Sequence, residues 1–149
     1  MPGSWEGVDL DEVRKALPDN LYWQLAAPTQ DPKLLEWRDA EHDRWNVEYG
    51  KVLSGTGTED EVRAYYDHRA RVSGDYVEFA TYLLDHYGGQ LPEQDVGLLK
   101  LARQLHLARL EEIPRKVEEA LDHQRAQAAA RAAWLADQAQ FDAGDSDSQ

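Results

Sequence analysis

The hydrophobic positions of this chain recur with helical spacing, most clearly over residues 58–87. Large apolar side chains return there every three or four residues, as on one face of an α-helix, whereas a strand would place them at every second residue. Thr58 and Glu61 have the spacing of a capping box at a helix start. Glycines 88–89 are expected to end the helix, because glycine adopts the left-handed C-cap conformation at no steric cost. The pattern predicts one long helix over 58–87.

A second helix is predicted over residues 31–54. Asp31 fits the N-cap position, and Pro32 fits the first helical position, where its missing N–H costs nothing. Glycines 55 and 57 end the apolar pattern. Because only a few residues connect this helix to the one over 58–87, the two are predicted to form an antiparallel hairpin.

A third helical pattern extends over residues 92–140 and contains Pro114. A proline inside a helix removes a backbone hydrogen bond and clashes with the preceding turn, so the helix must kink or break. The five residues before Pro114 include no Gly, Asn or Ser to build a reversal of the chain. This favours a kinked continuous helix over a break that folds residues 115–140 back as a fourth helix.

The two ends of the chain differ in character. Residues 5–30 carry many large apolar side chains and are predicted to pack on the helices as a strap, with Asp9 capping a short helix. Residues 142–149 hold one apolar side chain, an alanine, and are predicted to be a disordered acidic tail. The expected fold is a single all-α domain over 1–141, an antiparallel bundle of three long helices, or four if Pro114 breaks the last one.

The predicted register brings charged and aromatic side chains together at mid-bundle. Folding the helices back on one another places Trp45 near His68 and Trp37 near Tyr76. Glu41, Arg69 and Glu112 lie at this level. An unpaired buried charge costs several kcal/mol, so these side chains should form an ion pair that fixes the register. The alternative interpretation is a ligand pocket, whose candidate residues are Glu41, Trp45, Tyr65, Arg69, Tyr76 and Glu112.

The third helix is longer than its predicted partners. If it is continuous, about 20 residues, or roughly 30 Å, extend past the start of the helix over 58–87. An exposed apolar stripe of this size usually marks an interface. The strap, a second chain or a folded-back fourth helix could cover the stripe, and a symmetric antiparallel homodimer is the simplest solution. The candidate interface residues are Leu121, Ala128, Trp134 and Leu135.

The net charge of the chain limits the kinds of partner that it is expected to bind. Asp and Glu outnumber Lys and Arg by 29 to 16, for a net charge of −13. Such a surface repels phosphate backbones and anionic lipids, so neither nucleic-acid binding nor membrane insertion is expected. The absence of cysteine excludes disulfides and thiolate chemistry but leaves two compartments open, the cytoplasm or, if a leader was removed, the periplasm. The excess of arginine over lysine in an acidic chain favours a bacterial source.

Candidate catalytic and metal-binding groups are sparse. A di-iron bundle needs repeated carboxylate and histidine pairs three residues apart, and Asp39 with His42 is the one such pair. No positioned base accompanies a serine, so no catalytic residue, metal or cofactor is expected. The sequence predicts a non-enzymatic interaction protein that self-associates or docks a protein partner through the second half of the 92–140 helix. The alternative is a helical bundle that binds a small molecule in an aromatic pocket anchored by Glu41 and Arg69.

Overall fold

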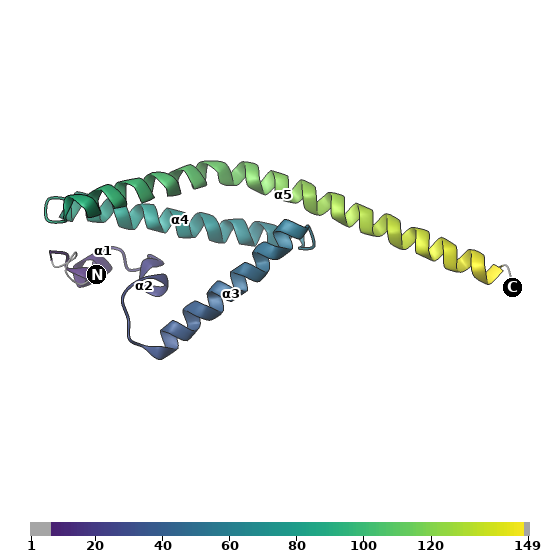
Figure 1. Cartoon of the computed structure of the whole chain (residues 1–149), viewed down its shortest axis with the longest axis horizontal. Helices are drawn as coiled ribbons and strands as arrows, with labels where there is room; N and C mark the ends of the chain where they lie inside the picture. The colour runs from purple at the N-terminus through teal and green to yellow at the C-terminus, as the bar shows by residue number, and fades with distance from the viewer. Residues whose placement is uncertain (1–6, 148–149) are drawn as a thin grey trace.

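The structure is a computed structural model that describes residues 7–147, and this part of the chain is helical with no strand. Its five helices are α1 (Leu10–Ala16), α2 (Tyr22–Leu25), α3 (Pro32–Ser54), α4 (Glu59–Tyr87) and α5 (Glu93–Asp147). Figure 1 shows α4 and the first half of α5 lying side by side, while the second half of α5 extends beyond all other elements. The prediction of an all-α fold is confirmed for the described residues.

Local sequence explains where α3 and α4 begin and end. The Thr58 hydroxyl accepts a hydrogen bond from the Glu61 backbone N–H at 3.1 Å, and the Glu61 carboxylate accepts one from the Thr58 N–H at 3.0 Å. Gly55 ends α3 with a left-handed φ of 71°. The prediction of a left-handed Gly88 is wrong, since its φ is −56°. Glycine is needed there for a different reason: a Cβ would clash with the carbonyl oxygen of Leu84.

The buried side chains form two separate clusters at opposite ends of α4. One cluster joins the N-terminal strap to the second half of α4 and the start of α5, and it comprises Val8, Val13, Trp23, Phe79, Ala80, Leu83, Tyr87, Leu91 and Leu99. The other joins the end of α3, the start of α4 and the middle of α5, and it comprises Val52, Val62, Tyr65, Ala120 and Leu121. The middle of the molecule is therefore less tightly closed than its two ends.

The strap over α1 and α2 is anchored to α4 by hydrogen bonds as well as by apolar packing. Asn20 is buried, and its side-chain amide donates to the Asp75 carbonyl oxygen at 2.7 Å and to Glu78 Oε1 at 3.1 Å. The Asp75 carboxylate accepts from the Leu21 backbone N–H at 2.9 Å. Tyr22 stacks on Phe79 with 3.8 Å between ring centroids. Residues 1–6, including Trp5 of the predicted strap, lie outside the described part of the chain.

Helix α3 diverges from α4 along its first half (Figure 1). Trp45 stacks on His68 as the register predicts, with 3.9 Å between ring centroids. The predicted contact of Trp37 with Tyr76 is wrong, because Trp37 is 39% exposed and Tyr76 stacks on His106 instead. The strap explains the difference: α2 contacts both α3 and α4, and Arg38 of α3 donates hydrogen bonds to carbonyl oxygens at the end of α2 and just after it.

Helix α5 is continuous through Pro114, so residues 115–140 do not fold back as a fourth helix. Figure 1 shows its ribbon arching along its length. The helix also extends to Asp147, and the prediction of a disordered tail is wrong over residues 142–147; residues 148–149 lie outside the described part. Once a helix is nucleated, each added residue contributes one backbone hydrogen bond, so a polar composition does not by itself end it.

Candidate functional site

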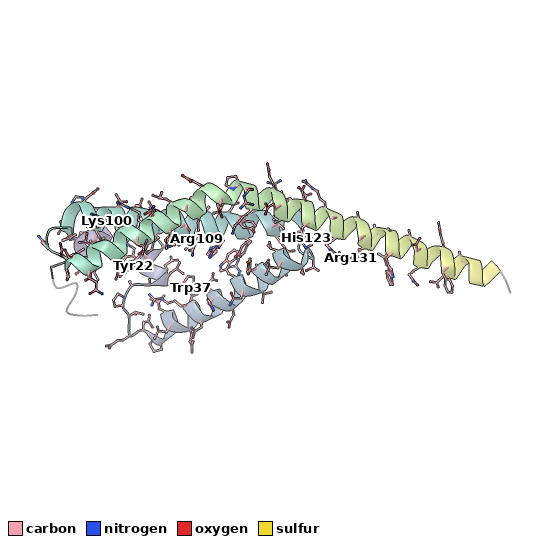
Figure 2. All side chains as sticks on the ribbon, turned by 45° about the horizontal axis from the view of Figure 1, so that its top comes forward. Tyr22, Trp37, Lys100, Arg109, His123 and Arg131 are labelled. Atoms are coloured by element: carbon pink, nitrogen blue, oxygen red, sulfur yellow. The ribbon has the colours of Figure 1, made fainter. Side chains whose placement is uncertain are left out.

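An open cleft of about 570 Å³ lies between α3, α4 and α5, in the region between the two buried clusters. Five of the six residues predicted for a ligand pocket line it, namely Glu41, Trp45, Tyr65, Arg69 and Glu112. The sixth, Tyr76, lines a smaller pocket of about 260 Å³ beside α2. Figure 2 shows side chains from α3 and from the α4–α5 pair facing each other across the wedge between them. The divergence of α3 is what creates this cleft.

The cleft has an aromatic wall. The ring planes of Trp45 and His68 lie within 4° of parallel, and Tyr49 stacks on Tyr65 with 5.3 Å between ring centroids. The Trp45 indole N–H donates to Glu41 Oε2 at 3.1 Å, which fixes the orientation of the ring. Flat, partly buried rings of this kind offer stacking surfaces to a planar molecule.

The charged side chains of the cleft do not form the predicted ion pair. Within the described residues, Glu41 pairs with Arg44 and Glu112 pairs with Arg115, both on their own helices, and neither carboxylate pairs with Arg69. The prediction failed because Arg69 and Glu112 are exposed. A solvated charge does not carry the desolvation cost that would force it to pair.

Two histidines beside the cleft are held in their neutral forms. Burial lowers the pKa of His106 below its usual 6.5, and the nearby charges of Arg109 and Arg69 lower it further. Burial likewise lowers the pKa of His68. The His106 Nδ1 lies 3.0 Å from the Ser73 hydroxyl oxygen, which links α5 to α4. At neutral pH the positive charge at this part of the cleft therefore comes from arginine and lysine side chains.

The second candidate surface is the part of α5 that extends past α4, residues 125–144, which we call the projecting segment. Contacts to the rest of the chain lie at its start: Arg125 forms an ion pair with Glu59 at 2.8 Å, and just before it His123 Nε2 lies 3.1 Å from the Leu53 carbonyl oxygen. Every residue of the projecting segment is exposed. Figure 2 shows it as a single helix with no other element alongside.

The predicted interface residues fall partly on this segment. Ala128, Trp134 and Leu135 are exposed, Trp134 by 60% and Leu135 by 54%. Leu121 is not part of the exposed surface, because the start of α4 reaches it and it is 5% exposed in the second buried cluster. Phe141, which is 70% exposed, is not among the predicted interface residues. Phe141 lies seven residues after Trp134, on the same helical face, and this spacing is the sequence pattern that would have predicted its place beside Trp134.

The described residues show no sign of a metal site or of a membrane-spanning helix. No group of three or more His, Asp or Glu side chains there is arranged to hold a metal ion. No described helix combines the length and the apolar character that a membrane crossing needs. Comparison with protein-family models, curated protein sequences and solved structures finds no match to this chain.

Proposed function

We propose that this protein is a non-enzymatic interaction protein that associates with a protein partner through the projecting segment of α5. The observation that carries the proposal is the exposure of Trp134, Leu135 and Phe141 on a helix that nothing else in the described chain covers. Contiguous apolar surface of this kind typically marks a site of protein association.

The energetics of a lone helix support the same proposal. The projecting segment continues α5 and needs no nucleation of its own, but most of the stability of a helix in a protein comes from tertiary packing of its apolar face. Beyond Arg125 and Gln127 at its start, the described structure gives the projecting segment no tertiary contact to offset the entropy of ordering it. A partner packed along the segment would bury its apolar side chains and stabilise the helix.

The test is the mass of the particle in solution. Size-exclusion chromatography with light scattering should give the wild-type chain a mass above its 17.0 kDa monomer. Replacing Trp134→Glu and Leu135→Glu together should return it to the monomer. Val47→Glu is the matched control, because Val47 is also 60% exposed but lies on α3, and this variant should associate like the wild type. A wild-type chain that stays monomeric at high concentration would count against self-association.

The cleft favours a second candidate function, the binding of a small molecule. Its volume of about 570 Å³ lies within the range of typical ligand sites, and aromatic rings line it together with a few polar groups. Because Arg69 pairs with neither Glu41 nor Glu112, its guanidinium is available to a ligand. The combination fits a planar molecule that carries a negative group.

The cleft can be tested with the fluorescent probe 1-anilinonaphthalene-8-sulfonate, which carries a flat naphthalene ring and a sulfonate group. The titration should use the Trp134→Glu, Leu135→Glu background, so that the projecting segment does not bind the probe. Arg69→Gln should weaken binding by roughly tenfold, since a hydrogen bond to a charged group is worth about 1.5–3 kcal/mol. Lys100→Gln, on α5 away from the cleft, should leave binding unchanged. Equal binding by both variants would exclude an anion site at Arg69.

A further inference from the structure

We infer that the partner of the projecting segment is a second copy of this chain, and that two projecting segments pair antiparallel with Leu135 near the centre. This inference rests on the proposed function and specifies the partner and its orientation. Three observations lead to it: the distribution of charge along the segment, the spacing of its small side chains, and the position along α5 of helices α1 to α4, which we call the folded body.

The charge of the segment changes sign along its length. Arg125 and Arg131 precede the Trp134–Leu135 pair, and Asp137 and Asp142 follow it. A parallel pair would place arginines beside arginines and aspartates beside aspartates, which costs free energy. An antiparallel pair places the basic half of each segment against the acidic half of the other. The segment is therefore complementary to itself in one orientation only.

The small side chains allow two such helices to approach closely. Ala128, Ala132, Leu135 and Ala139 recur at steps of four, three and four residues, which puts them on one face of α5. Trp134 and Phe141 lie about a third of a turn from this face, at the edge of such a pair. The face also includes Leu121, seven residues before Ala128, which packs against α4. The packing face of α5 thus continues past the end of α4 into the projecting segment, where a second α5 can take the place of α4.

The folded body favours the same orientation. Helices α1 to α4 all lie toward the N-terminal end of α5, away from most of the projecting segment, as Figure 1 shows. In an antiparallel pair the two bodies sit at opposite ends of the paired segments, whereas a parallel pair would bring them side by side at the same end. The chain carries a net charge of −13, so close approach of two bodies would be repulsive.

Charge reversal distinguishes the two orientations. Arg131→Asp should weaken dimerisation at least tenfold, measured by sedimentation equilibrium, because it puts an aspartate opposite the acidic half of the partner. Adding Asp142→Arg to the same chain should restore the wild-type dissociation constant to within about threefold, because residue 142 lies on the same flank of α5 as residue 131 and close to it in an antiparallel partner. In a parallel pair, residue 131 faces its own counterpart, so the second change would not restore binding. Arg131, labelled in Figure 2, lies on the projecting segment and is exposed in the described structure, so neither change disturbs the buried clusters.

Spin labels give an independent readout of the geometry. The chain has no cysteine, so Ala129→Cys and Ala136→Cys, both outside the packing face, each provide a single attachment site. In the antiparallel dimer, residue 129 of one copy lies opposite residue 141 of the other. At a rise of 1.5 Å per residue, labels at residue 129 should be roughly 18 Å apart along the axis, and labels at residue 136 should be within about 10 Å of each other.

The possible outcomes separate the orientation from the proposed function. A long distance at Ala129 with a short one at Ala136, measured by electron paramagnetic resonance, supports the antiparallel pair. Short distances at both positions mean a parallel pair, which overturns the inferred orientation while self-association stands. A monomeric mass by light scattering, with no dipolar coupling at either position, overturns the second copy as the partner.

Discussion

The His123 ring lies against the end of α3, with its Nε2 3.1 Å from the carbonyl oxygen of Leu53. A carbonyl oxygen only accepts hydrogen bonds, so Nε2 carries the proton in this contact. The last carbonyl groups of a helix have no partner within the helix, and here α5 provides one. This contact fixes α5 at the α3–α4 connection, and the projecting segment begins two residues later, at Arg125.

Gly55 should be essential at this connection. Its φ of 71° is unfavourable for other residues, and a Cβ there would lie 2.6 Å from Gln127 Cγ and 3.0 Å from His123 Nε2. We expect Gly55→Ala to lower the free energy of unfolding by about 1–2 kcal/mol, measured by urea denaturation. Gly50→Ala is the control, since Gly50 lies within α3 with open space around it and alanine should raise stability there by up to about 1 kcal/mol. A neutral Gly55→Ala would contradict the close approach of α5.

Glu61 should make the stability of the fold depend on acid pH. Its hydrogen bond from Lys51, at 2.6 Å, and a second one from the Thr58 backbone N–H lower its pKa from 4.5 to about 2. A carboxyl whose pKa is lower in the folded state stabilises the fold above pH 4.5 and loses this contribution as the pH falls toward 2. Glu61→Gln should therefore flatten the decrease in stability between pH 4.5 and 2, measured by thermal denaturation at a series of pH values. An unchanged pH profile would contradict the interaction of Glu61 with Lys51.

Asn20 should contribute more to stability than its position in a loop suggests. It is 4% exposed, and its side chain bonds to Asp75, to Glu78 and to the Tyr22 backbone N–H. Asn20→Ala would leave buried polar groups without partners, so we expect a loss of about 1–3 kcal/mol in chemical denaturation. Asn46→Ala, on the exposed face of α3, should change stability by less than about 0.5 kcal/mol.

Leu83 marks the centre of the first buried cluster. It is fully buried, whereas Leu105 on α5 is 55% exposed. Leu83→Ala should cost about 2–5 kcal/mol because it leaves a cavity that the surrounding helices fill only in part. Leu105→Ala should cost far less, and the difference in denaturation midpoint between the two variants measures the effect. Similar losses in both variants would mean that the α4–α5 packing differs from the one described.

Sequence patterns predicted the helices themselves well because their limits are set locally. The capping box at Thr58, the proline after Asp31 and the left-handed Gly55 act through neighbouring residues in the chain. The stacking of Trp45 on His68 was also predictable, because a short connection leaves the hairpin little choice of register near its turn. Away from the turn, small differences in crossing angle accumulate, and Trp37 does not reach α4.

What the sequence alone determined is the all-α class, the positions of its long helices and the excess length of the last one, since periodicity, caps and glycines record local preferences. The tertiary structure decided the rest. The strap packs beside α3, and this opens the cleft and leaves Arg69 and Glu112 exposed. Leu121 is buried against the start of α4, whereas Phe141 is exposed. These outcomes depend on contacts between segments far apart in the chain, such as that of Asn20 with Asp75, and no local pattern encodes them.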